Sequence, residues 1–215
     1  IQNNNSKKNL FIIGAGPSGV EIACKVYDIC KNKFDISIVE RSNEILSKNK
    51  IFNREEAEKA LKRRKINILL NSIVKEITDQ KITILNNSLI KDFDQDFVIW
   101  TAGVKPNLPL IDEKVTLTNG RISVNTKFQI DNFSNAFAIG DIASIKGMED
   151  LPLTAQVAMQ EGNHLAQNIE LLSQNKDLLP FEFQDNGEMI SLGIGEASIS
   201  ALGLTLSGKL AFEVR

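Results

Sequence analysis

Three glycines near the start of the chain have the types and spacing that bind the pyrophosphate of a dinucleotide. Gly14, Gly16 and Gly19 form a G-x-G-x-x-G pattern between an apolar run at 10–13 and a segment with helical periodicity. Gly14 would allow a tight turn, Gly16 would let the phosphates approach the backbone, and Gly19 would let the helix pack closely on the strand. A glycine turn with a purely structural role is the alternative.

Two further features complete the predicted nucleotide site. The helix that follows the turn would direct its N-terminus at the phosphates, so Pro17 and Ser18, which lie between the glycines, are also predicted cofactor contacts. Glu40 ends a second predicted strand about 20 residues after Gly19, where a carboxylate can accept the adenosine ribose hydroxyls. Glu40 would favour NADH by repelling a 2′-phosphate, but the neighbouring Arg41 could offset this, so NADPH is left open.

The elements that must position these residues alternate between strand and helix. This order predicts an α/β fold with a Rossmann-like parallel sheet and crossover helices. Residues 54–64 are strong helix formers with Ala57, Ala60 and Leu61 on one face. We predict the strands at 10–13, 35–39, 66–70 and 97–100, the helices from 20 and from 54, and a hairpin with strands at 74–77 and 81–85.

The apolar run of the last predicted strand stops on small residues and a proline at 101–107, so we place a domain boundary there, with domains at 1–103 and 104–215. Asn119-Gly120 between alternating apolar residues predicts a hairpin over 115–124. We expect a short buried strand at 135–139 and a helix over 153–169 with Thr154 as its N-cap. Residues 181–208 read as short strands and turns that are hard to assign.

Composition excludes several classes of protein. The formal net charge is -2, and the single dense basic run at 62–65 reads as the end of a helix, so we expect no nucleic-acid partner. No apolar stretch approaches the roughly 18 residues of a membrane span, so we expect the chain itself to be soluble. One His, and two Cys in a single predicted helix, predict neither a metal site nor a redox dithiol. Residues 2–6 look like a linker, and we interpret the chain as a piece of a longer protein.

Three motifs together resemble those of the two-dinucleotide-binding flavoprotein superfamily. They are GAGPSGVE at 14–21, WTAGVKPN at 100–107 and FAIGD at 137–141. The resemblance implies an NAD(P)-binding Rossmann domain at 1–103 and, at 104–215, the returning half of a discontinuous FAD domain whose first half would precede Ile1. It implies that Gly140 and Asp141 bind FAD, although Asp141 could instead cap a turn. It also implies that the nicotinamide stacks on the flavin at Ala102 and Gly103, where a plain turn is the alternative.

A fourth motif is similar to one in type II NADH:quinone oxidoreductases. Residues 155–160, AQVAMQ, resemble the A-Q-x-A-x-Q motif of that group, which implies a cofactor contact at Ala155. Gln156 and Gln160 are four residues apart, so their amides would share a helical face and could hydrogen-bond a quinone. Glu21 matches the glutamate that approaches nicotinamide and flavin, or is simply a first-turn glutamate stabilised by the helix dipole. His164 could face the quinone or be an ordinary helix histidine.

The resemblance implies hydride transfer from NADH to FAD and electron transfer onward to a membrane quinone. Residues 187–210 are similar to the branch found in photosynthetic membranes, some members of which reduce demethylphylloquinone. Peripheral association with the cytoplasmic side of a membrane, through segments outside this chain, is expected, and a homodimer is left open. The alternatives are a nucleotide-binding module without turnover and a sister reductase that passes electrons to a ferredoxin or rubredoxin.

Overall fold

The computed structural model describes residues 7–31 and 33–214, so the predicted linker at 2–6 lies outside the described residues. The chain folds into two compact units. The first, which we call the glycine-turn unit, combines the chain up to Gly103 with the segment from Asn186 onward. The second, the middle unit, is Val104–Asp185. The predicted division at residue 103 matches the first boundary, but residues from Asn186 pack with the glycine-turn unit rather than with 104–185.

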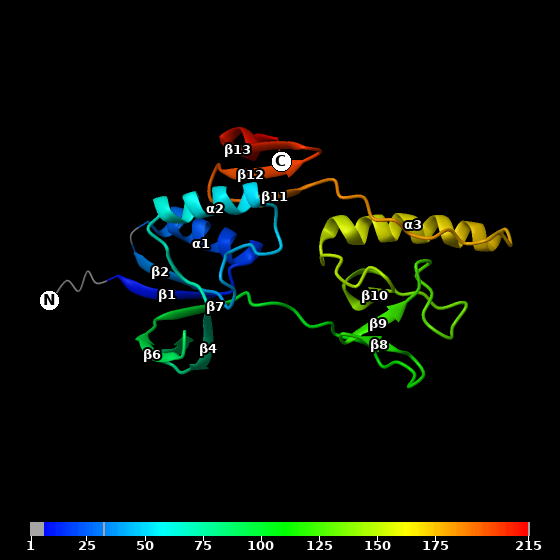
Figure 1. Cartoon of the computed structure of the whole chain (residues 1–215), viewed down its shortest axis with the longest axis horizontal. Helices are drawn as coiled ribbons and strands as arrows, with labels where there is room; N and C mark the ends of the chain where they lie inside the picture. Colours follow the sequence, from blue (N-terminus) through cyan, green and yellow to red (C-terminus); the bar gives the residue numbers. More distant parts are fainter. Residues whose placement is uncertain (1–6, 32, 215) are drawn as a thin grey trace. The chain divides into compact units, whose positions relative to one another are not determined.

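A parallel four-stranded sheet, in the order β3-β2-β1-β7, forms the centre of the glycine-turn unit. The predicted strands and crossover helices are confirmed, with ends shifted by a few residues. The strands are β1 (Lys8–Ile13), β2 (Phe34–Val39), β3 (Asn67–Leu69) and β7 (Phe97–Trp100), and the helices are α1 (Pro17–Cys30) and α2 (Ile51–Arg63). Helices α1 and α2 cover one face of this sheet (Figure 1).

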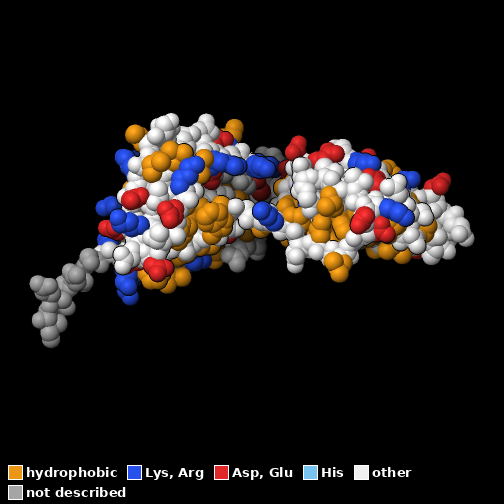
Figure 2. Space-filling view, turned by 90° about the horizontal axis from the view of Figure 1, so that it is seen from below, with side chains coloured by type: hydrophobic (Ala, Val, Ile, Leu, Met, Phe, Trp, Pro, Cys, Tyr) orange, Lys and Arg blue, Asp and Glu red, His pale blue; other side chains and the backbone are white. Residues whose placement is uncertain are grey.

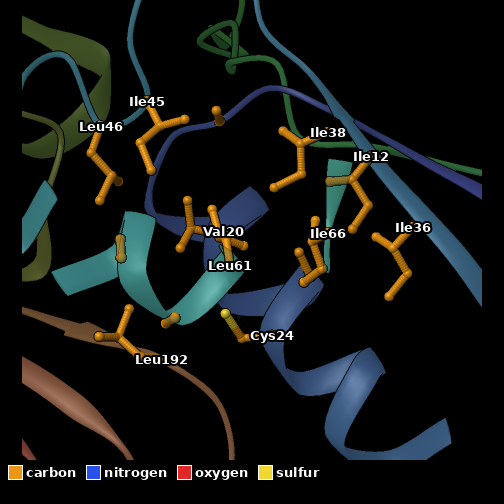
Figure 3. Close-up of a cluster of buried hydrophobic side chains, with 14 of the residues drawn as sticks. Ile12, Val20, Cys24, Ile36, Ile38, Ile45, Leu46, Leu61, Ile66 and Leu192 are labelled. Atoms are coloured by element: carbon orange, nitrogen blue, oxygen red, sulfur yellow. The ribbon is translucent and has the colours of Figure 1, made fainter. Parts of the chain in front are cut away.

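Both faces of the sheet are buried, which explains why β1 is apolar at every position from Leu10 to Ile13. Leu10 and Ile12 belong to a buried cluster with side chains of α1 and α2. Figure 3 shows Ile12 in this cluster with Val20 and Cys24 of α1 and Leu61 of α2. Phe11 and Ile13 point the other way, toward Ile82 and Ile84.

A second, antiparallel sheet supplies Ile82 and Ile84. It consists of β4 (Ser72–Ile77), β5 (Lys81–Asn86) and β6 (Leu89–Asp94). The predicted hairpin corresponds to β4 and β5. The third strand was not predicted, because its residues are mostly exposed and carry no clear apolar alternation.

The C-terminal segment forms a third sheet, which lies over α1 and α2 (Figure 1). Its elements are β11 (Glu188–Ser191), β12 (Ala197–Ala201), β13 (Leu204–Gly208) and the short helix α4 (Lys209–Glu213). Ile190 and Leu192 are 2% and 3% exposed and join the α1–α2 core. This contact is the physical reason that the segment belongs to the glycine-turn unit.

Charged side chains fasten this third sheet to the helices. Glu188 accepts hydrogen bonds from the Lys50 backbone N–H at 2.5 Å and from the Asn53 side chain at 2.9 Å. The N-terminus of α2 has no side-chain cap from its own residues, so Glu188 supplies the favourable negative charge there. Asp28 of α1 forms two hydrogen bonds with Arg64, at 2.7 and 2.9 Å, and accepts the Ile194 N–H at 2.8 Å.

The middle unit contains the sheet β10-β9-β8, the 3₁₀ turn η1 (Gly140–Ile142) and the long helix α3 (Ala155–Ser173). The predicted hairpin is confirmed as β8 (Leu117–Thr118) and β9 (Arg121–Val124), with positive φ at Asn119 and Gly120. Thr154 is the N-cap of α3, as predicted, and accepts the Val157 N–H at 3.3 Å.

The predicted strand at 135–139 is wrong. Only Phe137 in that segment pairs, through an isolated bridge to Gln129. One edge of β9 is taken by β8 and the other by β10 (Ala143–Ile145), so the strand that completes this sheet comes after the Gly140–Asp141 turn and not before it. Residues 181–183 are likewise extended without pairing, although Phe181 is buried.

The surface carries both signs of charge. On the face shown in Figure 2, Lys and Arg side chains are interspersed with Asp and Glu, and hydrophobic side chains are exposed between them. Within the described part of the chain, no helix combines the length and hydrophobicity needed to cross a membrane.

Candidate nucleotide and flavin sites

The glycine turn joins β1 to α1 with almost no space to spare. Gly14 has a φ of +104°, which favours glycine, and its N–H donates to the Val39 carbonyl at 2.8 Å. A Cβ atom on Gly19 would lie 1.9 Å from the Gly14 carbonyl oxygen, so only glycine lets α1 start this close to the turn. A Cβ atom on Gly16 would meet nothing within 4 Å. Gly16 is therefore the position in the turn where a phosphate could approach the backbone.

The N-terminus of α1 is available to a ligand. Its N-cap is Gly16, which has no side chain to accept the first N–H groups, and Pro17 is the first helical residue. Unsatisfied N–H groups at a helix N-terminus form a natural site for phosphate. Thr101, which the sequence analysis missed, supports the turn by donating its hydroxyl to the Ile13 carbonyl at 2.8 Å.

Glu40 is held at the edge of this turn by two backbone groups. Its carboxylate accepts the Ala15 N–H at 2.7 Å and the Ser42 N–H at 2.8 Å. Partial burial alone would raise the pKa of Glu40, but these hydrogen bonds outweigh it and the pKa lies below its ordinary value. Glu40 is therefore ionised at neutral pH and fixed in place, with lone pairs left to accept ribose hydroxyls.

These residues border a cleft of about 570 Å³ in the glycine-turn unit. It brings together six predicted site residues: Gly14, Gly16, Pro17, Glu40, Ala102 and Gly103. Ser18 and Gly19 adjoin it on α1 without lining it. Residues that the sequence analysis did not predict also line the cleft, among them Lys48, Ile73 and Trp100. Trp100 is 60% exposed at the end of β7, and its place at the start of the WTAGVKPN motif is the sequence signal that could have identified it.

Glu21 lies outside the lining of this cleft. The helix begins at Pro17, so Glu21 is in the second turn, and the alternative of a first-turn glutamate is wrong. Its carboxylate accepts the Ser191 N–H at 3.0 Å, which links α1 to β11. The assignment of Glu21 to the nicotinamide remains a prediction.

A second candidate site lies in the middle unit, at the turn η1. Gly140 begins this turn with a φ of +73°, and the exposed Asp141 follows it. No described residue donates a hydrogen bond to the Asp141 carboxylate, which leaves it available to a ligand. Beneath the turn, Glu161 of α3 accepts the Gly140 N–H at 2.5 Å and is only 4% exposed.

Glu161 was not predicted, although its position four residues after Val157 places it on the buried stripe of α3. Burial raises the pKa of Glu161 and the nearby Asp141 carboxylate raises it further, while the Gly140 N–H opposes both. Glu161, Gly140, Asp141 and Ser144 border a cavity of about 20 Å³. The buried Ser144 hydroxyl has no hydrogen-bond partner in the structure.

One row of polar side chains on α3 holds an extended segment, residues 179–184, against the helix. Gln160 exchanges two hydrogen bonds with the Gln184 backbone, at 2.8 and 3.0 Å, and Asn168 does the same with Leu179. His164 contacts the Leu179 carbonyl and packs on the rings of Phe128 and Phe181. For His164 the structure thus favours the ordinary helix residue over the quinone contact.

Gln160 has a packing role in this row that the sequence analysis did not include. Gln156 lies one turn closer to the helix start and is half-buried, and Ala155 is the exposed first residue of α3. The quinone assignments of Gln156 and Gln160 remain predictions.

Residues 1–162 match the family described as pyridine nucleotide-disulphide oxidoreductase. The chain belongs to this family. Among curated proteins, it is 34% identical to demethylphylloquinone reductase NdbB of a Synechocystis strain over 97% of this chain and 52% of that protein. It is 32% identical to the alternative NAD(P)H-ubiquinone oxidoreductase C1 of Arabidopsis thaliana over 95% of this chain and 44% of that protein.

The fold also resembles that of a solved structure. NDH2 from Plasmodium falciparum, solved in complex with NADH, superposes with a TM-score of 0.79 at 16% identity, over 96% of this chain and 61% of that one. This likeness shows the fold alone. The chain spans about half the length of the curated relatives described above.

Proposed function

We propose that this chain is about half of an FAD-dependent NAD(P)H:quinone oxidoreductase of the type II kind. The observation that carries the proposal is the cleft in which a glycine turn, an uncapped helix N-terminus and a fixed carboxylate meet. The names of two relatives, a demethylphylloquinone reductase and an NAD(P)H-ubiquinone oxidoreductase, support the same assignment. The domain roles follow from it, with nucleotide binding in the glycine-turn unit and flavin binding in the middle unit.

The cleft residues fit a reduced dinucleotide. The space above Gly16 would take the pyrophosphate, which the N-terminus of α1 would stabilise. Glu40 would accept the adenosine ribose hydroxyls, because its carboxylate is ionised and held by Ala15 and Ser42. Ala102 and Gly103 would leave room beside the nicotinamide.

NADH is the expected substrate, because the Glu40 carboxylate would repel the 2′-phosphate of NADPH. The cleft lining also contains Arg41 and Lys48, which carry positive charge. These cations would reduce the discrimination, so we expect measurable activity with NADPH.

The turn in the middle unit fits part of a flavin nucleotide. Asp141 offers a free carboxylate to hydroxyl donors, and a ribitol chain carries such donors. The Thr154-capped N-terminus of α3 lies in the same unit and lines the cavity beside the turn. FAD, when bound, would supply hydride acceptance and electron transfer to the quinone. Ala155 and Gln156 at the start of α3 would contact the flavin and the quinone, respectively.

We further propose that the complete protein works at the surface of a membrane, where its quinone substrate dissolves. The cytoplasmic side, peripheral attachment and a homodimeric state are the expected arrangement, carried over from the resemblance. Glu21 would act between nicotinamide and flavin only if the Ser191 contact opens when the nucleotide binds.

The test uses the complete gene product that includes these 215 residues, purified with its flavin. NADH and NADPH are each assayed with a soluble quinone and with a ferredoxin as acceptor. We expect NADH and quinone to give the highest kcat/KM. Faster reduction of ferredoxin would instead assign the protein to the sister reductases, and a purified protein without flavin would favour a binding module.

A further inference from the structure

We propose that Glu161 is a positioning residue that holds the Gly140–Asp141 turn in the shape that receives the flavin. This inference rests on the proposed function, because it concerns the same flavin site. Glu161 would not touch the flavin; it would act through the backbone of the turn.

First, a hydrogen bond joins the turn η1 to helix α3. Gly140 stands at the start of the turn with left-handed backbone geometry, and its N–H donates to the Glu161 carboxylate at 2.5 Å. This N–H precedes Asp141 directly, so the position of the Asp141 carboxylate depends on it. A carboxylate acceptor makes such a bond stronger than a neutral acceptor would.

Second, burial of the Glu161 carboxylate costs folding free energy, because no described cation is paired with it. Its side chain is nine-tenths or more buried, and within the described ranges no Lys, Arg or His forms an ion pair with it. The charged groups that face it are Asp141, which repels it, and Arg121, which lines the same cavity from β9 and donates to the Glu149 carbonyl. A buried acid without a paired cation lowers the stability of the fold.

Third, the cavity that adjoins the Glu161 carboxylate and the turn is small. The adjoining cavity measures about 20 Å³, which is room for about one water molecule. The partnerless Ser144 hydroxyl borders this cavity. The Gly140 N–H is therefore satisfied by Glu161 and by no other described group.

Two variants of matched size separate the roles of the carboxylate. Glu161→Gln keeps an oxygen that can accept the Gly140 N–H, whereas Glu161→Met has a similar length and no such acceptor. Both are made in the complete, flavin-containing protein. We expect Glu161→Gln to bind FAD within about twofold of the parent protein and Glu161→Met to bind at least tenfold more weakly, a loss of about 1.4 kcal/mol.

The readouts are the dissociation constant for FAD, from the change in flavin fluorescence, and the dissociation constant for NADH. Binding of NADH at the glycine turn should be unchanged in both variants, which controls for the fold. A second set adds each change to Asp141→Asn. If Glu161 acts through Asp141, the loss caused by Glu161→Met should shrink in that background.

Equal FAD binding by Glu161→Met and the parent protein would overturn the inference, and so would a Gln variant as weak as the Met variant. Failure of the parent protein itself to bind FAD would instead contradict the proposed function. If Glu161→Met does not fold, Glu161→Gln is compared with the parent protein, alone and combined with Asp141→Asn. Retention of FAD affinity within about twofold in Glu161→Gln is still required, and a larger loss overturns the inference.

A pH series on the 215-residue chain gives a readout without flavin. The pKa of Glu161 is raised above its ordinary value of 4.5. Between pH 4.5 and the raised pKa, the folded chain therefore keeps a proton on Glu161 that the unfolded chain has released. The Glu161 contribution to the free energy of unfolding therefore falls as pH rises from about 4.5 through the raised pKa. In urea titrations, Glu161→Gln should gain stability relative to the parent chain over this range. A difference that stays constant with pH would show that Glu161 does not titrate there.

Discussion

Gly16 and Gly19 occupy the same turn, but only one of them has neighbours that exclude a side chain. Gly19 is needed by the fold, because a Cβ atom would collide with the Gly14 carbonyl. Gly16 has ordinary extended backbone angles and open space around it, so the fold does not require a glycine there. The absence of a side chain at Gly16 gives a ligand access to the N-terminus of α1.

This difference gives a matched pair of substitutions. Gly19→Ala should lower the free energy of unfolding by about 1–3 kcal/mol or more, because it overpacks the turn. Gly16→Ala should change stability by about 0.5 kcal/mol or less and weaken NADH binding at least tenfold, by about 1.4 kcal/mol. Urea titration and NADH fluorescence on the 215-residue chain measure both. Unchanged NADH affinity in Gly16→Ala would contradict the placement of the pyrophosphate.

Sequence reasoning found the residues whose types imply chemistry at this scale and missed those that support them. The three glycines and Glu40 were predictable from spacing, and the cleft gathers Gly14, Gly16 and Glu40 with Ala102 and Gly103. Glu161 and Thr101 were not, because a glutamate in a helix and a threonine after a strand occur for many reasons. Their roles depend on backbone groups that only the fold brings near.

The pairing of Asp28 and Arg64 works at the scale of whole elements. Arg64 follows α2, Asp28 belongs to α1, and the Ile194 N–H that Asp28 accepts lies between β11 and β12. A Cβ atom on Gly193 would lie 2.2 Å from the Asp28 carboxylate, so this turn is fitted to the ion pair. Three elements are therefore fixed by one carboxylate.

The charge of Asp28 makes this contact sensitive to pH. Burial alone would raise its pKa, but the hydrogen bonds from Arg64 and Ile194 outweigh burial and lower the pKa below 3.8. A lowered pKa gives stability that is present above the unfolded value and is lost as pH falls through the folded value. Asp28→Asn should cost about 1–3 kcal/mol at pH 7 and progressively less below pH 3.8.

Urea titrations of the parent chain and the variant at several pH values measure this cost. Asp35→Asn is the control, because Asp35 forms an exposed pair with Lys7 and should change stability little at any pH. A cost for Asp28→Asn that does not shrink in acid would show that the ionised carboxylate is not what holds the turn.

Elements with a strong apolar period were predictable, and those fixed by distant partners were not. The parallel strands and both crossover helices follow from the local pattern. The segment 135–139 looked like a strand because it is apolar, yet neither edge of β9 was free to pair with it. Short strands and turns were predicted for the segment that forms β11 to β13, but their bounds were not assigned, because they depend on contacts with α1 and α2 that the local sequence does not contain.

At the scale of the whole molecule, the core of the glycine-turn unit is assembled from segments far apart in the chain. Ile190 and Leu192 are buried among residues of α1 and α2, and the middle unit interrupts the sequence between them. The predicted boundary at 103 coincides with the point where the chain leaves the glycine-turn unit, whereas the return at Asn186 was not predicted. Composition shifts mark where a chain leaves a unit more clearly than where it rejoins one.

A chain shortened to residues 1–185 tests this arrangement. It would expose the apolar faces of α1 and α2, and the loss of two fully buried side chains corresponds to roughly 3–6 kcal/mol. We expect a lower urea midpoint and increased binding of the dye ANS. Leu202→Ser in the full chain is the control, because Leu202 is 85% exposed. A shortened chain as stable as the parent would show that the third sheet is dispensable.

The return of the chain to the glycine-turn unit also bears on how the protein is made. The ribosome releases the dinucleotide turn before the middle unit, but the side chains that close the core beside it emerge only after the whole middle unit has been translated. Until then the two crossover helices remain uncovered on one side. Nascent chains arrested before residue 190 should therefore recruit chaperones or stay protease-sensitive, even when β1 to β7 have been fully translated.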